Sequence, residues 1–455
     1  MQSKERCGDV RIRHPLARGM KLGWLKTFCL CLFAFFIYLL MIFKIGTHPF
    51  SDFQFYYEVA LGILRGETIS TFYKYFSAPG YPYLLSVILP IYHYSILIPQ
   101  LLNALMWSGL IWLYLRYPLV PASIATLAGY LLLAFNINCL SMITVLCSEI
   151  PYAFFFLVGL YVFGWGFKIL FETRPDKLKG RLFYFSVAGF FFGISQSIRP
   201  VTFLFLLLIS FLVIVGIRYL IFNTNGKGWQ LLLKGGMIPL ILTWSSFFIV
   251  AILLYWASGY GVTYVPQQKG IWNLYVGSNV ESKGSWNYGD SELITRLGEK
   301  YQWDGIKINK EFLPIVLNRM KADWAKNLQI YPEKLYRLLS PRGIPLWAIE
   351  QSKVRDKEKV YKVTNYLSWI NGFVLILSLW SWLICLVKKE RSWEEFFLFC
   401  ALGASFVSLI AHGYFLEVQG RYSNHLWLVM FIFYPVSLKV LKQSFIEKDE
   451  GCSLG

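Results

Sequence analysis

Long apolar blocks recur along almost the whole of this sequence, and they constrain the fold more than any other feature. Two of them, Leu30 to Phe43 and Phe203 to Ile217, contain no ionised side chain. Each lies in a stretch about as long as the roughly 20 residues that a helix needs to cross a bilayer. Charged residues make up only 15% of the chain, whereas soluble domains carry about a quarter. The sequence therefore predicts an all-α polytopic membrane protein.

About ten transmembrane helices are expected from the lengths of these blocks. They cover approximately Thr27–Ile45, Tyr94–Leu115, Leu119–Phe135, Ile150–Phe167, Leu182–Ser197, Thr202–Ile217, Gly236–Trp256, Tyr366–Val387, Phe396–Phe415 and Asn424–Leu438. The apolar stretch Pro79 to Tyr92 is too short to cross and rich in proline, so we expect it to be interfacial or re-entrant.

The net charge of +18 raises the question of nucleic-acid binding, because basic proteins neutralise phosphates. Lys and Arg instead cluster in the short segments between apolar blocks, as the positive-inside rule requires. This clustering accounts for the charge without nucleic acid. It also places both termini in the cytoplasm and the long hydrophilic segment on the outer side.

The sequence divides into three expected parts. An N-terminal transmembrane module covers 1–256 and contains the first outer loop, 47–93. An extracytoplasmic loop domain covers 257–364, and residues 365–455 form the last spans and a cytoplasmic tail. Within the loop domain, apolar residues recur at helical spacing: Leu313, Val316, Leu317, Met320, Trp324 and Leu328. This amphipathic helix is suited to lying on a membrane surface or on the spans, and packing against a small outer domain is an equal alternative.

Five charged residues lie at span ends that the predicted topology places on the outer face: Asp52, Glu149, Arg199, Glu417 and Arg421. Charges in or beside spans are costly and are functional candidates by default. Any one of them has about even odds of only contacting lipid headgroups. Their shared face is the stronger signal, although Glu417 and Arg421, four residues apart, can also form a structural pair.

Carboxylates and arginines at a membrane boundary suit group transfer from a lipid-linked phosphate. A carboxylate can accept the proton of an attacking hydroxyl, and arginines can stabilise the departing phosphate. The sequence contains no GxGxxG or GxxxxGK[ST] motif for nucleotides and no spaced His/Cys set for zinc. His412, alone in its span, is expected to be a structural hydrogen-bonding residue.

Several short motifs in order along the chain resemble those of the GT-C fold membrane glycosyltransferases. The nearest branch is that of the protein mannosyltransferases and aminoarabinose transferases, glycosyltransferase family 39. The resemblance covers about Lys21 to Leu441 and rests on the segments Ser51–Glu58, Ala78–Pro82, Ser148–Glu149, Ser197–Pro200, Asn273–Asn279 and Gly420–Tyr422. It implies a GT-C-like fold with an outer-face loop domain.

The resemblance also implies roles for the outer charges. It makes Asp52 the general base of an inverting transfer, with Glu149 as a catalytic residue that orients the sugar or the arginines. Arg199 and Arg421 would hold the carrier phosphate. Glu417 is a further substrate-binding candidate because it shares the outer face with these residues.

Three further substrate-binding candidates lie in the first outer loop. Relatives carry an Asp-Glu pair where this chain has Ser51-Asp52, so the two-acid loop is incomplete unless Glu58 contributes. Tyr57 and Tyr81 would either stack on the sugar or pack structurally, and packing is favoured.

The implied donor is a polyprenyl-phosphate sugar, and the acceptor a glycan, lipid or protein. Some GT-C enzymes use a divalent cation, but no pattern here demands one. The absence of an Asn-x-Ser/Thr sequon favours a bacterial plasma (inner) membrane, with the active site extracytoplasmic.

Two other functions compete with glycosyl transfer. A transporter or flippase of lipid-linked sugars predicts charges near the bilayer midplane and related halves, and neither is evident. A polymerase or ligase of surface glycans would share the donor and stays open. A non-enzymatic scaffold gives no reason for aligned outer charges.

Overall fold

The structure is a computed structural model of the 455-residue chain. It describes residues 23–49, 51–119, 123–172, 178–222, 236–259, 268–339, 352, 354, 356–388, 392–417 and 424–452. Every regular element in these ranges is a helix, as the sequence predicts.

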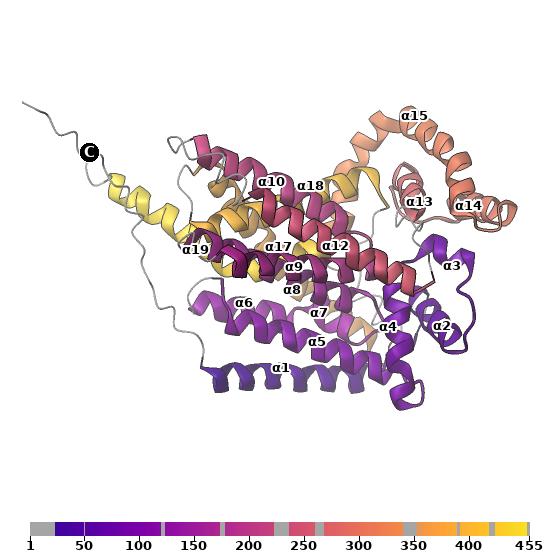
Figure 1. Ribbon diagram of the computed structural model, residues 1–455, viewed down its shortest axis with the longest axis horizontal. Helices are drawn as coiled ribbons and strands as arrows, with labels where there is room; N and C mark the ends of the chain where they lie inside the picture. The colour runs from indigo at the N-terminus through magenta and orange to yellow at the C-terminus, as the bar shows by residue number, and fades with distance from the viewer. Residues whose placement is uncertain are drawn as a thin grey trace, which may run out of the picture.

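Seven of the described helices are long and apolar enough to cross a membrane. They are α1 (Trp24–Ile45), α5 (Leu97–Arg116), α8 (Glu149–Glu172), α12 (Ile238–Ala257), α17 (Lys357–Val387), α18 (Trp393–Phe415) and α19 (Asn424–Cys452). Their long axes run roughly together through the body of the molecule, with α1 along one edge (Figure 1). The protein is therefore a multi-pass membrane protein.

Three other expected spans correspond to helices whose apolar windows are shorter. They are α6 (Ile124–Phe135), α9 (Leu178–Ile198) and α10 (Thr202–Phe222). The count of about ten spans thus stays a prediction, because seven helices within the described residues meet the length and hydropathy needed. The apolar stretch expected to be interfacial forms α4 (Gly80–Ile88) and a short 3₁₀ helix, η1 (Leu89–Tyr92).

Helix α9 packs between α8 and α12, and small residues allow its close approach to α12. A Cβ atom on Gly189 would lie 2.2 Å from the carbonyl oxygen of Thr243, and one on Gly193 would lie 2.8 Å from that of Phe247. The two glycines are four residues apart and face the same neighbour, which is the small-residue arrangement that brings membrane helices together.

Six helices gather at one end of the bundle, which we call the site end (Figure 1). They are α2 (Asp52–Leu64), α3 (Thr71–Phe76), α4, α13 (Gln268–Gly277), α14 (Tyr288–Lys300) and α15 (Gly305–Leu339). A second core of buried residues, separate from that of the bundle, joins α3, α13, α14 and α15. Segments far apart in the sequence are therefore held together at this end.

The expected amphipathic helix is part of α15, but its predicted apolar face divides into two. Val316 is buried in the second core with Ile308 and Phe312, whereas Leu317 and Trp324 are exposed. The interpretation of one apolar face was thus incomplete, because two neighbouring stripes on one helix produce a single helical periodicity in the sequence. The alternative, that the helix packs in a small outer domain, is correct for the stripe that contains Val316.

Candidate functional site

Glu149 and Arg199 form an ion pair at the site end. The Arg199 Nη1 atom lies 2.7 Å from Glu149 Oε1, and the two side chains are 18% and 5% exposed. Glu149 is the first residue of α8, and Arg199 follows the last residue of α9, where Pro200 removes a backbone donor and disfavours helix at the residue before it. A buried carboxylate needs such a partner, so the pair couples the ends of two packed helices.

The loop between α7 (Ile137–Ile143) and α8 is fixed by polar side chains from inside the bundle. The Gln100 amide donates to the Thr144 carbonyl oxygen at 2.5 Å, and the Asn103 amide donates to that of Val145 at 3.2 Å. The Thr47 hydroxyl also donates to the Thr144 carbonyl. Thr47 belongs to the segment between α1 and α2, so these bonds tie the first outer loop to the start of α8.

Asp52 is the first residue of α2 and is half-buried. It follows Ser51, whose φ of 49° is unusual for a residue with a side chain, and it precedes the buried Phe53. The partial positive charge of a helix N-terminus favours a carboxylate here. This turn and this buried anchor hold Asp52 at the site end, in the loop that Thr47 ties to α8.

The Pro-Gly-Tyr-Pro segment packs against the end of α9, two residues before Arg199. A Cβ atom on Gly80 would lie 2.5 Å from Ser197 Oγ, so the start of α4 abuts the end of α9. Tyr81 is buried, its ring packs edge-on against that of Tyr56 at 5.3 Å, and Glu149 lies close enough to act on it electrostatically. Its hydroxyl has no hydrogen-bond partner among the described residues.

Tyr57 and Glu58, the other two candidates in the first outer loop, form hydrogen bonds within or near that loop. The Tyr57 hydroxyl donates to the Tyr94 carbonyl oxygen at 2.8 Å, which agrees with a packing role. Glu58 is exposed and accepts a hydrogen bond from the Gln54 amide at 2.8 Å. It lines a shallow pocket between α2 and the loop that follows it, together with Glu67.

The end of α18 is a further part of the site. Glu417 is buried, and its backbone carbonyl lies 2.9 Å from His412 Nε2. That contact agrees with the structural role expected for His412, and the charges of Arg199 and Lys334 both act on its ring. Arg421 lies outside the described residues.

Lys334 of α15 joins the loop domain to the bundle and was not singled out from the sequence. Its buried ammonium donates to the carbonyl oxygens of Gly277 at 2.8 Å and Tyr414 at 3.0 Å. Burial lowers the pKa of Lys334 to about 8. A Cβ atom on Gly277 would lie 2.4 Å from the Leu416 carbonyl carbon. The ends of α13 and α18 therefore meet at this lysine.

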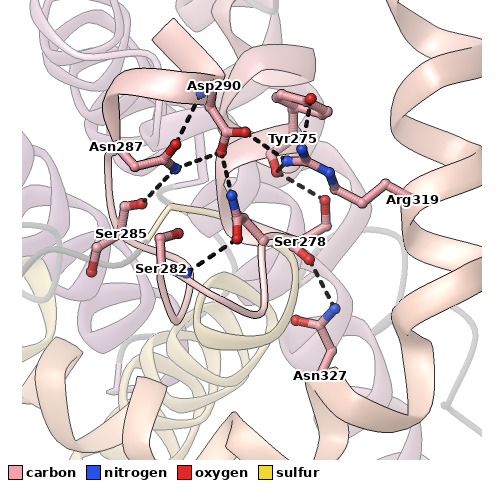
Figure 2. Close-up of polar contacts among 9 residues, drawn as sticks. Tyr275, Ser278, Ser282, Ser285, Asn287, Asp290, Arg319 and Asn327 are labelled. Carbon is pink, nitrogen blue, oxygen red and sulfur yellow. Dashed lines mark hydrogen bonds and ion pairs between the residues drawn. The ribbon is translucent and has the colours of Figure 1, made fainter.

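A polar cluster holds the 278–287 loop that follows α13 (Figure 2). The buried Asp290 carboxylate accepts hydrogen bonds from Asn279 at 3.0 Å and Asn287 at 2.7 Å, and pairs with Arg319 at 2.9 Å. The Arg319 guanidinium also lies 3.5 Å from the centre of the Tyr275 ring. Asn287, Asp290 and Arg319 gave no sequence signal, because polar side chains are ordinary in a hydrophilic segment. Tyr275 and Asn279 belong to the segment Asn273–Asn279, one of those on which the resemblance rests. For the α7–α8 loop the sequence did contain a signal, because Gln100 and Asn103 are polar residues inside a predicted span.

The described residues contain no group of three His, Cys, Asp or Glu side chains close enough to hold a metal ion.

Comparison with known proteins gives a likeness in fold. No protein-family model and no curated protein sequence matches the chain. A crystal structure of the Archaeoglobus fulgidus oligosaccharyltransferase, tethered to an acceptor peptide containing the NVT sequon, is similar with a TM-score of 0.50 and 13% identity. The match covers 92% of this chain and 50% of that one.

A second structure of the archaeal oligosaccharyltransferase AglB from Archaeoglobus fulgidus, with an inhibitory peptide and a dolichol-phosphate, has a TM-score of 0.49 and 14% identity. The match covers 94% of this chain and 52% of that one. The chain thus spans about half the length of these enzymes, and its fold is GT-C-like.

Proposed function

We propose that the protein is a membrane glycosyltransferase that moves a sugar from a polyprenyl-phosphate carrier to an acceptor hydroxyl. The observation that carries the proposal is the buried Glu149–Arg199 pair, at the same end of the bundle as Asp52 and the Tyr81 segment. The GT-C-like fold supports it, and the ordered motifs favour the family 39-like branch.

The transfer exchanges one bond for another at the sugar's anomeric carbon. The acceptor oxygen attacks that carbon from the face opposite the phosphate, and its proton passes to the Asp52 carboxylate. The carbon–oxygen bond to the phosphate breaks, and the electron pair leaves on polyprenyl phosphate. The product is therefore inverted at the anomeric carbon.

Arg199 stabilises the charge that grows on the departing phosphate, because a guanidinium presents several donors in one plane. Glu149 holds Arg199 in position at 2.7 Å. Arg421 and Glu417 are assigned to the same phosphate and sugar region. Tyr81 offers a hydroxyl beside Glu149 for a sugar oxygen, whereas Tyr57 and Glu58 support the first loop. The active site faces the extracytoplasmic side of the plasma membrane in this proposal.

The test is sugar transfer in proteoliposomes supplied with labelled polyprenyl-phosphate sugars. We expect Asp52→Asn to lower the rate by about a hundredfold or more, because general-base catalysis contributes about 10²–10⁴. Asp323→Asn is the matched control, since Asp323 lies on α15, where its carboxylate pairs with Lys326 three residues further on. A rate for Asp52→Asn equal to that of the control would remove Asp52 as the base.

A further inference from the structure

Helix α15 carries an exposed apolar stripe in addition to its buried face. We define the α15 stripe as Leu317, Met320, Trp324 and Leu328, which recur at helical spacing. Leu317, Trp324 and Leu328 are 46%, 59% and 49% exposed, and Met320 is half-buried. The two prolines within α15 lie outside this stretch. The stripe is therefore one continuous face of uninterrupted helix.

The C-terminal half of α15 lies at the depth of a spanning helix. The Tyr331 hydroxyl donates to the Ile410 carbonyl oxygen of α18 at 3.1 Å, and Leu335 lies 3.0 Å from where a Cβ atom on Gly413 would be. Ile410 precedes the end of α18 by five residues, which is about 7.5 Å at the α-helical rise. This part of α15 runs beside the last turns of a span.

The stripe continues the surface that α18 presents to lipid. Met320 and Trp324 line a small crevice with Tyr414 and Phe415 at the end of α18, and Phe415 itself is exposed. An exposed apolar surface at this depth, adjoining a spanning helix, has lipid as its natural neighbour.

We propose that the α15 stripe inserts among the headgroups and first acyl carbons of the leaflet at the site end. Trp324 suits that layer because its ring is apolar and its indole N–H is polar. Lys321, exposed next to the stripe, can extend its ammonium group to lipid phosphates while its stem lies along apolar surface. This is the pattern of an interfacial helix.

Lipid contact on one face of α15 fixes the rotation of the helix about its axis. It thereby fixes which side chains the buried face presents to the bundle. On the buried face, the Asn327 amide donates to the Ser278 carbonyl oxygen at 3.1 Å, and Lys334 donates to that of Gly277. Rotation of α15 would move both donors away from the start of the 278–287 loop. The bilayer is thus part of the scaffold that positions this loop beside the bundle.

The test is the depth of nitroxide labels on single added cysteines in vesicles of phosphatidylcholine and phosphatidylglycerol. Trp324→Cys and Leu328→Cys report on the stripe. The matched controls are Ala322→Cys and Gln329→Cys, which are exposed on other faces of the same helix. The signal of labelled protein without an added cysteine is subtracted, because Cys29 is exposed.

We expect the ratio of collisions with oxygen to collisions with a water-soluble nickel chelate to be about threefold higher, or more, at the stripe positions than at the controls. Equal ratios would place the stripe in water and overturn the proposal. Protection from both reagents would mean contact with protein, and would overturn it as well.

A second measurement avoids added cysteines. Quenching by lipids brominated near the headgroup is compared between the wild-type protein and Trp324→Phe, and the difference isolates Trp324. A difference spectrum that the brominated lipids quench supports insertion, and an unquenched one contradicts it. Neither measurement depends on sugar transfer, so the inference stands or falls apart from the proposed function.

Discussion

Glu149 and Arg199 show how much a single ion pair depends on its surroundings. Their carboxylate and guanidinium meet at 2.7 Å with little exposure to solvent. Removing one member of a buried pair leaves the other charge desolvated, which costs about 3–5 kcal/mol, whereas removing both is often nearly neutral. The pair is consequently both a candidate for substrate contact and a condition for the stability of the α8–α9 ends.

We expect Arg199→Met to lower the free energy of unfolding by about 3–5 kcal/mol, because it removes the ion partner of the less exposed Glu149. Glu149→Gln should cost less, and the double variant should regain most of the loss. Thermal unfolding in detergent measures all three. A double variant as unstable as the sum of the single ones would show that the pair is not coupled.

Lys334 should make stability depend on pH. Its pKa is lowered by burial from 10.5 to about 8, so the unfolded chain binds more protons between these values and stability rises with pH across that window. We expect the melting temperature of the wild-type protein to rise, relative to that of Lys334→Met, from pH 8 to pH 10. A constant difference over this range would show that the lysine is not desolvated.

At the scale of elements, the packing of α9 on α12 depends on the absence of side chains. Gly189→Ala would place a methyl group 2.2 Å from the Thr243 carbonyl oxygen, so the helices must separate, at a cost of about 1–3 kcal/mol. Gly372→Ala of α17 is the control, since a Cβ atom there meets nothing within 4 Å. We expect the control to unfold like the wild-type protein, and equal melting temperatures for both variants would contradict close packing.

At the scale of the whole molecule, the proposed orientation places the site end outside the cytoplasm. Single cysteines at Tyr288, 82% exposed at the start of α14, and at Ile124, 88% exposed at the start of α6, mark the two ends. We expect a membrane-impermeant maleimide to label position 288 in intact cells. Position 124 should be labelled only after permeabilisation. The reverse pattern would invert the topology and remove the outer acceptor from the proposed reaction.

Much of the fold was predictable from the chain because apolar blocks of spanning length admit few structures other than helices in a bilayer. A helix such as Ile124–Phe135 is shorter than the roughly 20 residues needed to cross a bilayer, so its length does not decide whether it spans. The count of about ten spans is untested for that reason. In α15, periodicity identified a helix but merged two stripes, because Val316 and Leu317 are neighbours in sequence and on the helix surface. Which stripe is buried depends on α13 and α14.

The candidate site likewise contains residues that the sequence indicated and a residue that only the structure revealed. Charges at span ends marked Asp52, Glu149, Arg199 and Glu417 as a group, because the cost of placing charge near a bilayer makes such residues conspicuous. No such feature distinguished Lys334 in the sequence, since a lysine in a hydrophilic segment is ordinary. Only its burial against the carbonyl groups of Gly277 and Tyr414 distinguishes it.

The sequence by itself determined that the protein is helical and crosses the membrane several times, because hydropathy and block length act locally along the chain. Tertiary structure decided which ends meet: that Arg199 pairs with Glu149, that Gly80 abuts Ser197, and that α15 returns to the depth of α18. Such contacts join residues far apart in the sequence. They depend on the packing of whole helices, which no local pattern specifies.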